Sequence, residues 1–126
     1  MFDVVERDEV RVEYVASADG IEAIRDAWAR LENVVPLRGN RFFGTFGGSE
    51  YRACVEVRDT SFGLPAWKIP GGRYARARLR GEPPAVYEQI GPMLEKLESQ
   101  VDVDRARPVI EHYRRRDEID LLVPVA

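Results

Sequence analysis

The second half of this chain repeats the pattern of its first half. Residues 8–58 read as a strand, a helix and two further strands, and residues 71–125 read in the same order. A repeat that occurs only twice is not a solenoid, because solenoids need about three or more units. Two copies instead predict one domain with pseudo-twofold symmetry, with repeats at about 1–63 and 66–126. The seam between such copies is a natural place for a concave ligand site.

Length and charge bound the possible functions. A chain of 126 residues predicts a single domain over 1–126. Its net charge of −3 does not favour nucleic acid or an anionic membrane. The arginines at 73–80 and 114–116 are interpreted as solvated strand faces rather than as a nucleic-acid surface. We therefore expect neither direct nucleic-acid binding nor membrane contact.

The cysteine count and the lack of a leader indicate the cellular compartment in which the protein is expected. Cys54 is the only cysteine, so no intramolecular disulfide can form, which fits a reducing cytoplasm. The chain has no long apolar stretch and no basic-then-apolar leader. We expect a cytoplasmic protein in which Cys54 is structural or inert.

The first repeat shows the alternation typical of a strand and the spacing typical of a helix. Residues 9–15 alternate charged and apolar side chains, which predicts a half-buried strand. Ile21, Ile24, Trp28 and Leu31 then recur at helical spacing on one face, and Asp19 with Glu22 predicts a reciprocal cap for that helix. Trp28 is interpreted as a core anchor rather than a ligand-stacking group. Two strands follow, at 41–46 and 51–58.

The second repeat carries a proline inside its helix. A strand is predicted at 74–79, and the helix begins near 81–84 with a buried stripe of Val86, Ile90, Leu94 and Leu97. Pro92 lacks an N–H, and its ring presses on the carbonyl of Glu88, so we expect a bend or a break. Strands at 109–113 and 119–125 complete the repeat.

Two further positions predict close packing. Gly44 within an aromatic strand predicts a bulge or the close approach of another group. Phe62 and Trp67 lie in the connector 59–70, so they must either pack on the domain or line a cleft.

Glu111 is the strongest single indication of a site. It lies mid-strand on the same face as Val109 and Tyr113, since alternate residues of a strand share a face. A carboxylate on an apolar face is costly to desolvate unless something pairs with it. Its partner is either an arginine of the chain or a cationic or hydrogen-bonding ligand. Tyr113 is likewise either a core aromatic or a pocket wall.

Other kinds of chemistry find little support. His112 is the only histidine and points away from Glu111, and no spacing of carboxylates supports a zinc site. No serine lies in a G-x-S-x-G motif, and no glycine-rich dinucleotide fingerprint occurs. We expect no metal and no cofactor.

Three motifs of the second half resemble a known family. They are PGGRYA at 70–75 with Gly81 six residues later, PVIEHY at 108–113, and IDLLVPV at 119–125. In order and spacing these resemble the GyrI-like small-molecule-binding domains. Those domains are the effector-binding modules of many AraC- and MerR-type regulators, and they also occur as free-standing proteins. The first half is similar only in architecture.

The resemblance implies a fold and a set of site residues. It implies an α+β domain of duplicated βαββ units, with an antiparallel sheet, two helices and a central ligand groove. The family's pocket glutamate corresponds to Glu111. The expected aromatic walls are Phe46, Tyr51, Trp67, Tyr74 and Tyr113, of which only Tyr74 and Tyr113 lie in matched motifs. The tryptophan often found in the family's second helix is absent here.

Three functions are compatible with this resemblance. The first is the binding or sequestration of a bulky hydrophobic, often cationic or planar molecule. The second is hydrolysis of a reactive cyclopropanoid genotoxin in the same groove, with Glu111 and Tyr113 as catalytic candidates. The third is binding to a protein partner such as a regulator or DNA gyrase. Binding is favoured over catalysis because, apart from the candidate Tyr113, no second catalytic group can be placed near Glu111.

Overall fold

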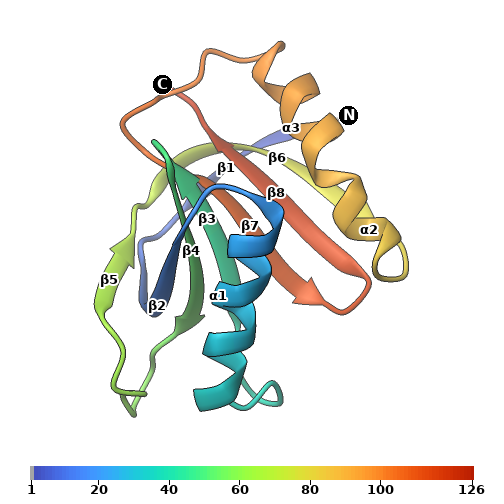
Figure 1. Cartoon of the computed structure of the whole chain (residues 1–126). Coiled ribbons are helices and arrows are strands. Elements are labelled where there is room, and N and C mark those ends of the chain that lie inside the picture. The colour runs from blue at the N-terminus through green and yellow to red at the C-terminus, as the bar shows by residue number, and fades with distance from the viewer. Residues whose placement is uncertain (1) are drawn as a thin grey trace.

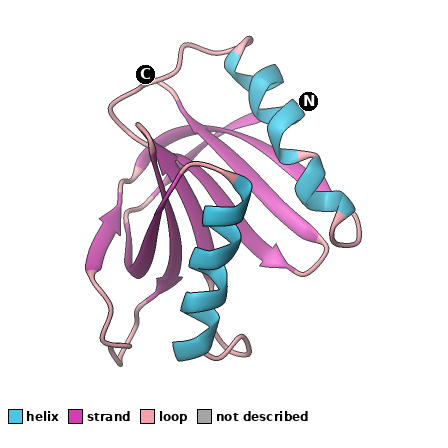
Figure 2. Ribbon diagram, in the orientation of Figure 1, coloured by secondary structure: helices cyan, strands magenta, loops and turns pink. Residues whose placement is uncertain are grey.

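The computed structural model describes residues 2–126 as an α+β fold built on one antiparallel sheet (Figure 1). The strands curl into a half-barrel, and the helices lie on one face of it (Figure 2). In chain order the elements are β1 (Asp3–Arg7), β2 (Val10–Ala18), α1 (Ile21–Val34), β3 (Phe42–Gly47), β4 (Glu50–Glu56), β5 (Ala66–Ile69), β6 (Gly72–Arg80), α2 (Ala85–Glu88), α3 (Ile90–Glu98), β7 (Val109–Arg115) and β8 (Glu118–Pro124).

The strand order confirms the duplication. It runs β1-β6-β8-β7-β3-β4-β2-β5, so the two βαββ units meet where β7 pairs with β3. Two strands were not predicted. β1 pairs with β6 of the second unit, and β5 pairs with β2 of the first. Both are short edge strands, and their pairing depends on a partner far away in the chain.

Both helices cover the same face of the sheet, as predicted. The core under α1 includes Leu31 and Ala53, and the core under α3 includes Leu97 and Leu121. Ala53 and Leu121 share a face because Ala53 pairs with Gly44, Gly44 pairs with Glu111, and Glu111 pairs with Leu121. Leu31, Val86 and Leu97 are buried, and four further stripe residues are partly buried and pack against the cores: Ile24, Trp28, Ile90 and Leu94. Ile21 is exposed, so the predicted stripe of α1 does not extend to it.

The second helix is interrupted near Pro92, as predicted. It ends at Glu88 and resumes at Ile90, with a turn at Gln89 between the two segments. Pro92 therefore falls in the first turn of α3, where the missing N–H is tolerated.

The predicted cap of α1 is wrong. The N-cap residue is Gly20, with φ 125°, and no side chain caps the helix. Asp19 instead accepts a hydrogen bond from the Gly20 N–H, at 2.8 Å. Because Gly20 takes a backbone conformation that L residues rarely adopt, the chain enters the helix without the geometry that the capping box requires.

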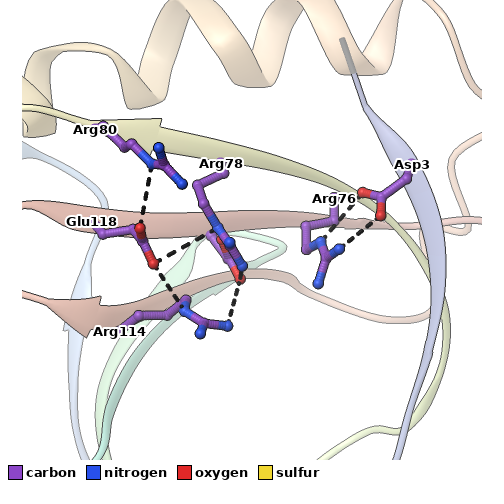
Figure 3. A network of polar contacts seen from close by, with 7 residues as sticks. Asp3, Arg76, Arg78, Arg80, Arg114 and Glu118 are labelled. Carbon is purple, nitrogen blue, oxygen red and sulfur yellow. Dashed lines mark hydrogen bonds and ion pairs between the residues drawn. The ribbon is translucent and has the colours of Figure 1, made fainter.

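The other face of the sheet has its own core and an arginine network. Apolar side chains from both units pack there: Val12, Phe43, Cys54, Ile69, Tyr74, Ile110 and Leu122. Cys54 is sealed inside, where burial raises its pKa to about 12, so the thiol is inert as expected. Arginines of the clusters seen in the sequence form ion pairs there with Asp3, Glu118 and Asp120 (Figure 3).

Candidate functional site

Glu111 lies in the middle of β7, on the helix-covered face, where the two units meet. Figure 1 shows α1 over one half of this face and α2 and α3 over the other. The side chain of Glu111 is half-buried. It is therefore neither fully exposed nor sealed inside the core.

Two tyrosine hydroxyls donate to the same oxygen of Glu111. The Tyr51 hydroxyl, from β4, lies 2.8 Å from Oε1, and the Tyr113 hydroxyl, from β7 itself, lies 2.6 Å from it. The indole N–H of Trp28 in turn donates to the Tyr51 hydroxyl at 3.0 Å. A chain of hydrogen bonds thus connects α1, β4 and β7 and fixes one carboxylate oxygen in place.

Gly44 explains how these groups fit together. It pairs with Glu111 in the sheet, in regular register and without a bulge. A Cβ at this position would collide with the Tyr51 hydroxyl and with Oε1 of Glu111. The predicted close approach is therefore confirmed, and it occurs because two polar side chains rest on the glycine backbone.

Aromatic rings flank the carboxylate from both helices. The Trp28 ring of α1 packs edge-on against Tyr113 with centroids 5.2 Å apart, and the Tyr87 ring of α2 does so at 6.4 Å. Phe42 packs against Trp28 from β3. Tyr87 is 46% exposed, and Trp28 and Tyr113 are only partly buried. Aromatic surface beside Glu111 is therefore left uncovered.

Glu111 has no basic partner among residues 2–126. None of the ion pairs there involves it, which removes the arginine partner considered from the sequence. Burial raises the pKa of Glu111, and the hydrogen bonds from Tyr113 and Tyr51 partly oppose that rise. Burial and the nearby Glu111 charge also raise the pKa of both tyrosines, so both remain neutral donors.

Glu13 shows what a satisfied carboxylate looks like in this fold. It lies on the same face of the sheet and is 4% exposed. Its Oε1 accepts the backbone N–H groups of Phe62 and Leu64, at 2.9 and 3.0 Å. Burial acts to raise the pKa of Glu13, but its hydrogen bonds outweigh that effect and the pKa is lowered. Glu13 thus fixes a loop, whereas Glu111 faces aromatic surface.

The structure brings Glu111, Tyr51 and Tyr113 into direct contact. Phe46 lies on the same face of β3 as Gly44 and packs into the core that contains Tyr51. Tyr74 and Trp67 do not reach this cluster. Their positions in β6 and β5 turn them to the opposite face, because Tyr74 shares its face with Leu122 and Trp67 shares its face with Val12.

Tyr74 and Trp67 have other partners on that face. Tyr74 is fully buried, and its hydroxyl donates to the Pro70 carbonyl at 2.6 Å. Trp67 packs edge-on against Tyr14 and stacks with the Arg52 guanidinium. The expectation that all five aromatic residues line one groove is therefore corrected for these two.

Trp28 and Tyr87 are site residues that sequence reasoning did not identify. Trp28 was interpreted as a core anchor from its helical spacing, and Tyr87 falls outside the buried stripe of its helix. One indication was available for Trp28, because an indole N–H that is buried requires an acceptor. For Tyr87 the missing information was that α2 is a separate short helix that ends at Glu88.

Two hollows of the described chain lie away from Glu111. One, of about 350 Å³, lies beside β2 and β5, and the other, of about 280 Å³, lies beside the turn after β3. Trp67 lines both. Two of the basic groups there already have acidic partners, because Arg52 pairs with Glu50 and Lys68 pairs with Glu9. We therefore regard the unpaired carboxylate, and not these hollows, as the candidate site.

The sequence matches no protein-family model and no curated protein. Within residues 2–126, no helix is both long and apolar enough to cross a membrane. The fold does match solved structures over their length. An integron cassette protein from the mobile metagenome of Vibrio cholerae, VCH_CASS2, superposes with a TM-score of 0.84 at 13% identity, covering 99% of this chain and 95% of that chain.

Two further structures are similar. SAV2435, solved bound to tetraphenylphosphonium, has a TM-score of 0.71 at 12% identity, covering 98% of this chain and 93% of that one. A protein assigned to bacterial transcription regulation, from Staphylococcus aureus MU50, has a TM-score of 0.64 at 12% identity, covering 98% of each chain. At these identities the comparisons show the fold alone, and that fold agrees with the resemblance of the sequence motifs to the GyrI-like domains.

Proposed function

We propose that this chain binds bulky hydrophobic cations over Glu111. The observation that carries the proposal is a half-buried carboxylate that has no basic partner among the described residues and is flanked by partly exposed aromatic rings. An ionised carboxylate in such a place lacks a counter-ion, and a ligand cation supplies one. Aromatic faces add roughly 0.5–2 kcal/mol each by cation–π attraction.

The similar structure of SAV2435 supports this class of ligand, since it was solved with a hydrophobic cation. Hydrolysis remains the second candidate from the sequence, but it needs a group that works with Glu111. The nearest titratable groups are Tyr51 and Tyr113, whose raised pKa values make them poor bases near neutral pH. Binding is therefore the function that the geometry supports best.

Titration calorimetry with tetraphenylphosphonium tests the proposal. Glu111→Gln keeps the shape of the side chain and removes its charge, so we expect affinity to fall by about tenfold or more. Glu13→Gln is the matched control, because it removes a buried carboxylate that already has its own partners, and it should bind like the parent chain. Absence of binding by the parent chain, or equal binding by the Glu111 variant, would contradict the proposal.

A further inference from the structure

The two oxygens of Glu111 are used unequally. Both hydroxyl bonds end on Oε1, and no described residue donates to Oε2. Among residues 2–126 the single buried polar side-chain atom without a partner is Nδ1 of His112, on the other face of the sheet. Because Oε2 has no donor and is not among the sealed atoms without a partner, part of its surface is open to solvent. The site therefore presents one free acceptor oxygen.

The surrounding contacts keep that asymmetry in place. Oε1 rests against Gly44, where a Cβ would collide with it, and it holds both tyrosine hydroxyls. The Tyr51 hydroxyl is itself held by the indole N–H of Trp28. Rotation of the carboxylate would exchange the two oxygens, but one oxygen would still accept both hydrogen bonds and the other would accept none.

A ligand that covers Glu111 either donates a hydrogen bond to Oε2 or leaves this oxygen without one. A cation with an N–H can donate to it, and such charge-assisted bonds are about twice as strong as neutral ones. A cation without a donor excludes water from Oε2 and offers no hydrogen bond in its place, so Oε2 loses the hydrogen bonds that it accepts from water. Charge attraction and ring stacking are similar for both kinds of cation.

We propose that the site selects protonated amines, whose N–H donates to Oε2 of Glu111, over quaternary cations of similar size. This inference rests on the proposed function and narrows its ligand class. A site that recognised only charge and apolar surface would bind both kinds of cation equally well. Tetraphenylphosphonium belongs to the disfavoured kind, because it has no N–H to donate.

A matched pair of probes tests the selection. N,N-dimethyl-1-pyrenemethylamine is protonated at pH 7.5, and N,N,N-trimethyl-1-pyrenemethylammonium carries the same ring and charge without an N–H. Calorimetry on the full chain should show the amine binding about tenfold more tightly, which corresponds to about 1.4 kcal/mol. Glu111→Gln should weaken both probes and abolish the difference, because its amide can turn an N–H group toward the ligand.

A second series of probes distinguishes the effect of the hydrogen bond from the effect of ligand size. It uses the parent chain and does not depend on the Glu111→Gln variant. The primary, secondary and tertiary pyrenemethylamines all carry an N–H, so their affinities should be similar, with one drop at the quaternary ion. A steady change with each added methyl group would overturn the inference. Equal binding of amine and quaternary ion, with both weakened by Glu111→Gln, would overturn it and leave the proposed function standing. Absence of binding by every probe would overturn both.

Discussion

At the scale of single residues, Glu111 and Glu13 are carboxyl groups on one sheet face with opposite pKa shifts. The raised pKa of Glu111 means that its stabilising contribution is present at low pH and is lost as pH rises through its folded-state value. The lowered pKa of Glu13 means the reverse, since its contribution is present at neutral pH and is lost on acidification. The site carboxylate therefore costs stability where it is ionised.

This contrast gives paired predictions for stability. At pH 7.5, Glu111→Gln should raise the free energy of unfolding by on the order of 1 kcal/mol, and Glu13→Gln should lower it by a similar amount. The difference for Glu111→Gln should shrink at pH 4, where Glu111 and Gln are both neutral, whereas the difference for Glu13→Gln should persist until more acidic pH, because the pKa of Glu13 is lowered. Urea unfolding at the two pH values measures this. A Glu111 variant that is less stable than the parent at pH 7.5 would mean that its carboxylate is structural.

Gly44 gives a second prediction at this scale. Gly44→Ala should destabilise the chain by about 1–3 kcal/mol and weaken ligand binding, because the added methyl group displaces the Tyr51 hydroxyl and Oε1 of Glu111. Gly91→Ala is the control, since its Cβ would meet open space within α3 and should be neutral or slightly stabilising. Urea unfolding and calorimetry on both variants check this, and a Gly44 variant as stable as the Gly91 variant would contradict the packing.

At the scale of elements, Tyr87 lies on the short helix α2, which a turn at Gln89 separates from α3. Pro92→Ala restores an N–H that can donate to the Glu88 carbonyl, so we expect the two segments to join into one helix. Hydrogen exchange measured by NMR should then show protection of the backbone amide that the substitution introduces. If that amide exchanges as freely as an exposed loop amide, Pro92 is not the cause of the interruption.

At the scale of the whole molecule, each half supplies an edge strand to the other. β1 pairs with β6 across the two units, and β5 pairs with β2. Neither fragment, 2–63 or 64–126, should fold alone, because each would lose its partner strand and the central pairing of β3 with β7. Circular dichroism should show no cooperative thermal transition for either fragment. A cooperative transition in one of them would instead indicate two independent domains.

The sequence by itself determined what depends on local pattern. The alternation of residues 9–15, the helical stripe ending at Leu31, the interruption near Pro92 and the close approach at Gly44 each follow from residue spacing or backbone chemistry. Glu111 stood out because a charge on an apolar strand face is costly wherever the strand lies. These inferences need no knowledge of distant partners.

The tertiary structure decided which face of the sheet holds the site. Alternation along β6 already separates Tyr74 from Ala77, but both faces of this sheet are apolar, so pattern does not tell which one the helices cover. The short strands β1 and β5 likewise acquire their pairing only from the other unit. Trp28 and Tyr87 come near Glu111 because helices of the two repeats each place a ring against Tyr113 at the seam. Such contacts between distant segments depend on packing and not on the local order of residues.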